Sequence, residues 1–275
     1  MTYGEISRTM ILNPIRIVTD IWRHRYLLGQ LVKRDVLLRY RGAMFGVLWI
    51  FLSPLLMLVI FAYVFGQIFQ ARGGAAESNL PFWLFLYSGL IVFNIFSETV
   101  SRSPTSVRGY PSFVKKIIFP VQILPLVPLG AALVHGFFNF LILLAALSWT
   151  GNFHAQALLF PLALIPVILL ATGFAWFLGA WGVFIKDMTQ IVPVFIQMLM
   201  FLSPVFYPVS AVPGMLRPLY QSNPVSHVIE FSRGLVTGQP AEWSVWGVAL
   251  VISLAVAILG NFFFQHSREE FADVL

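Results

Sequence analysis

The fold of this chain is decided by its longest uncharged stretch, residues 117–185, which reads IIFPVQILPLVPLGAALVHGFFNFLILLAALSWTGNFHAQALLFPLALIPVILLATGFAWFLGAWGVFI. The stretch contains no Asp, Glu, Lys or Arg. Because about 20 apolar residues span the hydrocarbon core of a bilayer as a helix, it is long enough for two membrane helices and a turn. Lipid is therefore the expected solvent for much of the chain.

Four shorter stretches that lack these charged residues lie at 42–71, 78–97, 188–216 and 243–267. In lipid, a segment must satisfy its own backbone hydrogen bonds, which favours helices. The sequence therefore predicts an all-α integral membrane protein with six transmembrane helices. Their predicted cores are Phe45–Phe69, Phe82–Phe96, Val121–Trp149, Leu158–Phe184, Ile191–Tyr207 and Ser244–Phe264.

The composition excludes several classes of protein. Of 275 residues, 59% are hydrophobic and 10% are charged, whereas a soluble domain is about 25% charged. The chain has no Cys, which excludes disulfides and thiolate metal sites. It also lacks the Walker phosphate loop and the HExxH metal motif. We therefore expect no catalytic residue, metal or cofactor in this chain, and a transporter of this kind must take its energy from another subunit.

The basic residues indicate the orientation of the chain, whose net charge is +6. If the N-terminus is cytoplasmic, every Lys and Arg lies on the inner side except Arg72, Arg217 and Arg233. This asymmetry is the positive-inside pattern of membrane proteins. It predicts that both termini are cytoplasmic and that the basic charge reflects topology, so nucleic acid is not an expected partner. Residues 1–19 contain no uninterrupted apolar core, so no cleavable signal peptide is expected.

Residues 20–41 mix leucines with many basic residues, a pattern typical of an amphipathic helix on the cytoplasmic leaflet, with Asp20 as its N-cap. Such a helix can anchor the chain to membrane lipid, and it can also act as a moving gate or as a docking surface for a cytoplasmic partner. Among ionisable side chains near the spans, we expect Glu98 to be interfacial and His135 to be satisfied by its neighbours rather than to bind a ligand.

Two other segments are too polar to span. Residues 101–120 form the largest predicted cytoplasmic loop, either a plain basic loop or one with a short helix between Pro104 and Pro111. Residues 208–242 are predicted to be either an ordinary outer loop or short periplasmic re-entrant helices, which are tolerated at membrane depth only when protein or a wet cavity shields them.

The stretch Arg34–Met57, RDVLLRYRGAMFGVLWIFLSPLLM, resembles the ABC type-2 permeases, specifically the branch that exports O-antigen, capsular polysaccharide and teichoic acid. Further matches lie at Lys116–Pro120, Ser203–Pro208, Asn223–Pro224 and Arg233–Gly234. Lys186–Asp187 stands where the family usually has Arg-Asp, which keeps the charge but loses the planar guanidinium. The resemblance covers about residues 30–265.

The resemblance implies a permease in the bacterial inner membrane that acts as a homodimer with two copies of an ABC ATPase, which would bind ATP and Mg²⁺. It implies a cytoplasmic part (residues 1–41), a transmembrane domain (42–265) and a tail (266–275). Its implied cargo is a polysaccharide linked to undecaprenyl pyrophosphate. The residues implied to couple to the ATPase are Thr105, Val107, Arg108, Tyr110 and Phe113. Those implied for the gate helix and the lipid pyrophosphate are Lys33, Arg34, Arg39, Tyr40 and Arg41.

Aromatic side chains make up 16% of the chain and offer weak stacking surfaces for the apolar faces of sugar rings. The same residues are also ordinary lipid-facing and interfacial residues. The candidates for lining a sugar path are Trp49, Tyr63, Phe85, Phe93, Phe195, Phe206 and Tyr207. The alternative functions are a type-2 permease for a small drug or lipid, an intramembrane glycosyl- or acyltransferase, and a structural scaffold. A transferase would need acid and base residues in a pocket, which the sequence does not reveal.

Overall fold

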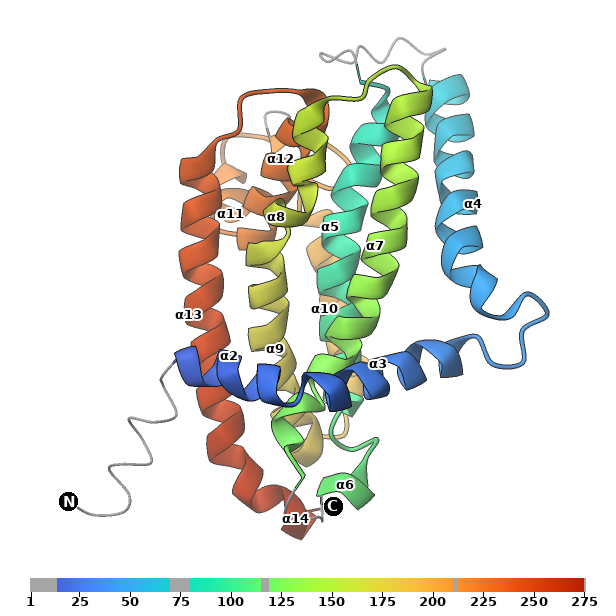
Figure 1. Ribbon diagram of the computed structural model, residues 1–275. Helices are drawn as coiled ribbons and strands as arrows, with labels where there is room; N and C mark the ends of the chain where they lie inside the picture. Colours follow the sequence, from blue (N-terminus) through green and yellow to red (C-terminus); the bar gives the residue numbers. More distant parts are fainter. Residues whose placement is uncertain (1–13, 70–79, 115–118, 210–211, 275) are drawn as a thin grey trace.

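The computed structural model describes residues 14–69, 80–114, 119–209 and 212–274. Helices joined by turns make up these residues, and none of the described ranges contains a β-strand. Figure 1 shows a bundle of long helices, with two N-terminal helices lying across one end of it. The all-helical prediction is thus confirmed for the described part of the chain.

Five helical segments are long and apolar enough to cross a membrane, and they agree closely with five of the predicted spans. The boundary at Trp149 is the one predicted. The second segment is longer than predicted because α5 (Phe82–Arg102) continues beyond Phe96. The five segments are Gly46–Gly66, Phe82–Thr105, Val121–Trp149, Ala155–Phe184 and Trp243–Glu270.

These segments contain the main helices of the bundle. The first holds α4 (Trp49–Tyr63), followed by a π-helical turn, Val64–Phe69. The third holds α7 (Leu126–Trp149). The fourth is divided into α8 (Phe160–Ala163) and α9 (Ile165–Phe184), with Pro166 in the first turn of α9. The last is α13 (Trp243–Ser267).

The predicted fifth span, Ile191–Tyr207, is only partly correct. The apolar helix α10 runs from Met188 to Phe201 and is shorter than the five spanning segments. The chain turns after Phe201 because backbone carbonyls of Pro204 and Val205 bond to the Arg233 guanidinium instead of continuing the helix. Six apolar helices are therefore present in the described chain, but only five have the length of a full span.

Helix α5 lies inside the bundle and carries its main apolar core. It packs against α7, α9, α10 and α12, and most of its apolar side chains are buried, with Leu84 and Val92 fully so. Helix α4, by contrast, is largely exposed and buries little more than Ile50 and Leu58. Figure 1 shows α4 at the edge of the bundle, beside α7. One side of the molecule is therefore much more loosely packed than the other.

The N-terminal segment forms two helices, α2 (Pro14–Arg23) and α3 (Arg25–Arg39), separated at His24. The prediction that Asp20 caps this helix is wrong: Asp20 lies in the last turn of α2, and its carbonyl oxygen accepts a hydrogen bond from the His24 amide. Within the described residues, α2 extends back to Pro14, so Asp20 lies inside a helix and not at its start. Both helices lie across the long helices of the bundle (Figure 1).

At the opposite end, the predicted outer segment contains α11 (Arg217–Gln221) and α12 (Pro224–Thr237). The Asn223 side chain accepts a hydrogen bond from the Val225 amide and so caps α12, which ends at Gly238 in the left-handed conformation. The segment is therefore folded and packed on α5 rather than an ordinary loop.

The C-terminal tail also packs on the bundle. After α13, a 3-10 turn (Arg268–Glu270) leads into α14 (Phe271–Val274). The Phe271 ring is fully buried against Phe184 and Phe264. The tail thus holds together the ends of α9 and α13.

Candidate functional site

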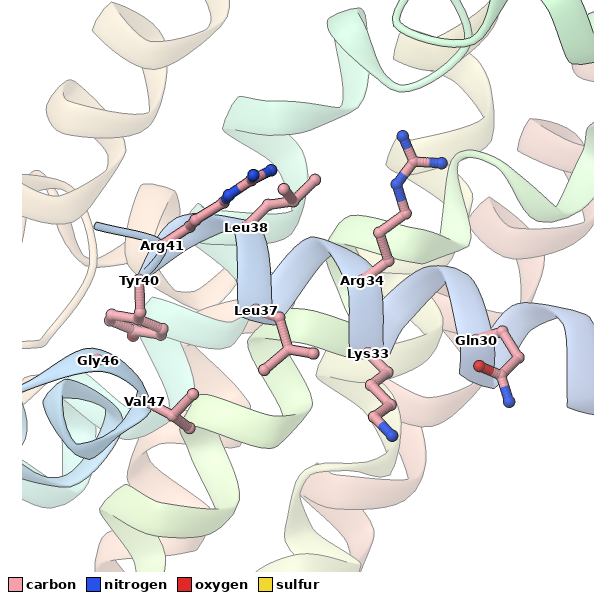
Figure 2. Close-up of a pocket in the computed structure, with 9 residues that line it drawn as sticks. All are labelled: Gln30, Lys33, Arg34, Leu37, Leu38, Tyr40, Arg41, Gly46 and Val47. Atoms are coloured by element: carbon pink, nitrogen blue, oxygen red, sulfur yellow. The ribbon is translucent and has the colours of Figure 1, made fainter. Parts of the chain in front are cut away.

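The junction between α3 and α4 is a sharp turn with a basic surface. Gly42 has a φ of 85°, in the region that favours glycine, which explains why a glycine follows Tyr40 and Arg41. Beside this turn is a hollow of about 450 Å³, shown in Figure 2. Its lining residues are Gln30, Lys33, Arg34, Leu37, Leu38, Tyr40, Arg41, Gly46 and Val47. Four of the five predicted gate residues therefore lie around one hollow.

The charges of this hollow are all positive. Lys33, Arg34 and Arg41 line it without any acidic side chain, and none of the three forms an ion pair with a described residue. In Figure 2 the Arg34 and Arg41 guanidinium groups point to one side of α3, and the Lys33 side chain points to the other. Cations without an acidic partner among the described residues make this hollow suited to an anionic group.

Among the described residues, two ion pairs join α3 to the C-terminal end of α5. Nη2 of Arg102 donates to both carboxylate oxygens of Asp35, at 2.7 and 2.9 Å. One turn later on α3 and one turn earlier on α5, Nη2 of Arg39 donates to Oε1 of Glu98 at 2.6 Å. Asp35 and Arg39 are four residues apart on α3, as are Glu98 and Arg102 on α5, so successive turns of the two helices are paired.

Glu98 also bonds to α7. Its Oε2 lies 2.9 Å from Nδ1 of His135, and the opposite ring nitrogen, Nε2, lies 3.2 Å from the Tyr40 hydroxyl. Nδ1 also lies 3.0 Å from Nη1 of Arg39. An imidazole that donates from Nδ1 to Glu98 and accepts at Nε2 from Tyr40 satisfies those two partners and leaves Arg39 to donate to Glu98. As predicted, neighbouring side chains satisfy His135. The pairing of His135 with Glu98 is not predicted from the sequence. The predicted span places Glu98 at its end, whereas α5 continues to Arg102.

A larger cavity, of about 830 Å³, opens next to this cluster between α4, α5, α7 and α10. Its polar lining comes from Arg39, Tyr40, Ser53, Tyr87, Asn94, Glu98, His135 and Asn139. Its apolar lining comes from Trp49, Ile50, Pro54, Met57, Phe61, Leu90, Met200 and Phe206. Polar and apolar side chains therefore line one space between helices of the spanning segments.

Hydrogen bonds fix part of this lining in place. The Tyr87 hydroxyl donates to Oδ1 of Asn139 at 2.9 Å, and Nδ2 of Asn139 donates to the His135 carbonyl at 2.7 Å. Asn94 is exposed and makes no hydrogen bond to a described residue. It therefore offers a free amide at the edge of the cavity.

The predicted path-lining aromatics do not gather at one place. Trp49 and Phe206 line the cavity. Tyr63 and Phe195 are well exposed, at 65% each, and Phe93 is buried in the core. The Phe85 ring lies under the Arg233 guanidinium, 3.7 Å from its carbon. The Tyr207 hydroxyl bonds to the Tyr220 hydroxyl at 2.6 Å.

Arg233 fastens α12 to the rest of the molecule. It is almost completely buried and donates to the carbonyls of Phe85 and Pro204, as well as to that of Val205 at 2.5 Å. Its only described acidic partner is Glu230, at 3.1 Å. The arginine of the Arg233–Gly234 family motif therefore has a structural role: it joins α12 to α5 and to the turn at residues 204–205.

The predicted coupling loop does not contain the short helix that was one of its two predicted forms. No continuous helix lies between Pro104 and Pro111: Pro104 belongs to a 3-10 turn, Ser103–Thr105, and Pro111 begins the short helix α6 (Pro111–Val114). Pro104 can lie this close to α9 because residue 182 is a glycine, where a Cβ would overlap the Pro104 carbonyl oxygen. The loop is therefore rigidly seated on the end of α9.

The five predicted coupling residues occupy different environments. Thr105 is exposed, Arg108 is half-buried and Val107 is fully buried, so Val107 supports the loop from within. Tyr110 and Phe113 stack with centroids 5.8 Å apart. Burial raises the pKa of the Tyr110 phenol, with the nearby Asp35 adding to the shift, so the hydroxyl stays neutral. Of the Lys116–Pro120 match, residues 116–118 lie outside the described residues.

Comparison with known proteins gives one matching family, described as ABC-2 type transporter, over residues 26–237. The O-antigen export system permease protein RfbA of Myxococcus xanthus is 26% identical over 272 residues, which cover 94% of this chain and 99% of the relative. The polysialic acid transport protein KpsM of Escherichia coli is 24% identical over 86% of this chain and 91% of its own length. The daunorubicin resistance ABC transporter permease protein DrrB1 of Streptomyces coeruleorubidus is 26% identical over 74% of this chain and 72% of its own.

Proposed function

Because this chain belongs to the ABC-2 type transporter family, we propose that it is the membrane subunit of an ATP-driven exporter that moves a lipid-linked polysaccharide across the bacterial inner membrane. Relatives named for O-antigen export and polysialic acid transport match nearly the whole chain and support this cargo. The relative named for daunorubicin resistance matches a smaller share and supports a drug permease less well.

The cavity between α4, α5, α7 and α10 is the observation that carries the proposal. Polar side chains in a membrane span are costly when they face lipid and usually face a water-filled path or another protein chain. Asn94 on α5 and Gln197 on α10 are both exposed within the apolar helices. A polymer with many hydroxyl groups is a suitable cargo for a path lined by such amides and by aromatic rings. An acyl- or glycosyltransferase would not require a path of this kind.

The exposed amides also support a homodimer. A second copy that covers the face formed by α4, α5 and α10 would shield Asn94 and Gln197 from lipid and enclose the cavity. The weak burial of α4 within one copy fits this arrangement, because α4 is the helix with the most unpacked surface. In this proposal the polysaccharide passes between the two copies.

The energy would come from two copies of a separate ABC ATPase that binds ATP and Mg²⁺ and docks on the loop at 103–114. Both termini would then be cytoplasmic. A reporter fused after Arg108 should show a cytoplasmic location, and a periplasmic signal there would contradict the orientation.

The basic hollow at the α3–α4 turn would receive the pyrophosphate of the lipid carrier. Lys33, Arg34 and Arg41 are suited to this role because no described acid neutralises them. Arginine is well matched to phosphate because its planar group can donate two parallel hydrogen bonds. Arg39, although predicted for the same role, is already paired with Glu98 and would instead hold α3 in place.

The proposal is tested by deleting the gene in its host and measuring surface polysaccharide with and without the restored chain. We expect the polymer to disappear from the surface and accumulate inside the cell, and to return with the wild-type chain. Asn94→Leu should restore it poorly at equal membrane abundance, because it removes an amide from the path. Asn152→Leu, in the turn after α7, is the matched control and should restore it fully. Normal surface polymer in the deletion strain would refute the proposal.

A further inference from the structure

A second basic hollow lies on the cytoplasmic side, between two loops that are far apart in the sequence. It encloses about 470 Å³ and is lined by Thr105, Arg108, Gly109, Lys186 and Thr189. The first three residues belong to the turn between α5 and α6, and the last two to the junction of α9 and α10. The family resemblance implies a coupling role only for the first loop, so the second loop has no assigned part.

The two cations of this hollow have no counterpart within the described chain. Neither Arg108 nor Lys186 forms an ion pair with a described residue. The nearest acid in sequence, Asp187, is not among the lining residues. The Thr105 and Thr189 hydroxyls donate to the backbone carbonyls of Arg102 and Lys186. Both hydroxyl protons are therefore used in hydrogen bonds within their own loops. Two like charges at one hollow favour the arrival of an anion.

The hollow is also firmly built. Its first loop is seated on α9 through the close contact between Gly182 and Pro104, and Val107 fills the space beneath it. Its second loop directly follows the last residue of α9, Phe184. A movement of a partner bound at this hollow would therefore be transmitted to α5, α9 and α10 together. A partner bound to a single flexible loop could not move the three helices in this way.

We propose that Arg108 and Lys186 together bind an acidic side chain of the ATPase, so that the subunit docks on both loops and not on the 103–114 loop alone. The inference rests on the proposed function, because it takes an ABC ATPase as the partner. A lipid phosphate is a less suitable occupant because the first loop leads directly into α6, which Figure 1 shows at the extreme end of the molecule, beyond α2 and α3. Charge complementarity thus favours a carboxylate from a cytoplasmic protein.

The test uses the full-length chain, tagged and co-expressed with the ABC ATPase encoded beside it, and measures the affinity of the ATPase for the purified permease. We expect Lys186→Glu and Arg108→Glu each to weaken binding at least about tenfold, a change of about 1.4 kcal/mol. Lys186→Arg should retain binding because the charge is kept. Arg268→Glu, an exposed basic residue in the turn after α13, is the matched control and should bind normally.

Several outcomes would separate this inference from the function it builds on. Wild-type affinity in both charge-reversal variants would overturn the docking role. Loss of binding to phosphatidylglycerol vesicles, with ATPase affinity unchanged, would also overturn it and assign the hollow to lipid. Failure of the wild-type chain to bind any ABC ATPase would instead refute the proposed function. An Asp→Lys or Glu→Lys change in the ATPase that rescues Lys186→Glu would identify the acidic partner.

Discussion

Replacing Asp35 with Asn should release α3 from the bundle more often than in the wild type. Arg102 donates to both oxygens of Asp35, and this pair is one of the two ion pairs between α3 and α5. Asparagine keeps the size of the side chain but removes its charge and one acceptor. Among the described residues, Arg102 would then retain only the more distant Glu98 carboxylate, 3.6 Å away, as an ionic partner.

The expected magnitude follows from how far the pair is buried. The Arg102 side chain is 33% exposed and that of Asp35 is 17% exposed. Fully exposed pairs contribute about 0–1 kcal/mol, and breaking a fully buried pair costs about 3–5 kcal/mol. Because solvent screens part of this interaction, we expect a loss of about 1–2 kcal/mol. This corresponds to about a 5- to 30-fold rise in the population with α3 undocked.

The absence of Cys from the chain allows a direct assay. Val36 lies on the buried face of α3, is only 7% exposed and packs against Ile50 and Ala131. A Val36→Cys thiol should therefore react with a charged maleimide only when α3 lifts away. In membranes, the labelling rate should rise about 5- to 30-fold when Asp35→Asn is added, in line with the change in population.

The matched control is Asp187→Asn in the same Val36→Cys background, because Asp187 is exposed and forms no ion pair with a described residue. Its labelling rate should stay at the level of the parent. Adding Arg102→Gln to Asp35→Asn should change the rate little further, since partners in one ion pair are not additive. If Asp35→Asn labels no faster than the control, the ion pair does not hold α3, and the reasoning fails.

Three other changes test separate contacts. Gly182→Ala should lower the thermal stability of the detergent-purified chain by several degrees, because its Cβ overlaps the backbone of Pro104, whereas Gly247→Ala, which meets open space, should not. Arg233→Lys should destabilise the outer segment by about 2 kcal/mol, measured by proteolysis of the segment at 217–237, because one ammonium cannot replace the several donors of the guanidinium. His135→Phe should reduce polysaccharide export at equal membrane abundance, because it leaves the Glu98 carboxylate short of a partner inside a span.

The positions of the helices were largely predictable from the sequence because the bilayer imposes a simple length rule. The predicted spans end at Trp149 and Phe184, the residues at which α7 and α9 end in the structure. The errors arose where tertiary contacts decide the outcome. Helix α10 ends at Phe201 because Arg233, about thirty residues further on, binds the carbonyls that follow it. No local pattern in the Ser203–Pro208 motif reveals that contact.

The candidate site was less predictable because it depends on side chains brought together from several helices. The sequence indicated a basic α3, and Figure 2 shows Lys33, Arg34 and Arg41 around one hollow. It gave no reason to separate Arg39 from them, because pairing with Glu98 depends on how α3 crosses α5. A signal was nevertheless present: acidic and basic residues four apart occur both on α3 and at the end of α5, and this spacing suits paired helices.

The close contact between α9 and α13 restricts which helices of such an exporter can vary in sequence as its cargo changes. A Cβ at Gly173 would lie 2.5 Å from the carbonyl oxygen of Val256, and a Cβ at Gly260 would overlap the carbonyl oxygen of Gly173. Larger residues there would force two backbones apart, so this half of the molecule admits little variation. Diversification toward new polymers should instead accumulate on the looser half, where α4 can accept bulkier or smaller side chains without disturbing its neighbours.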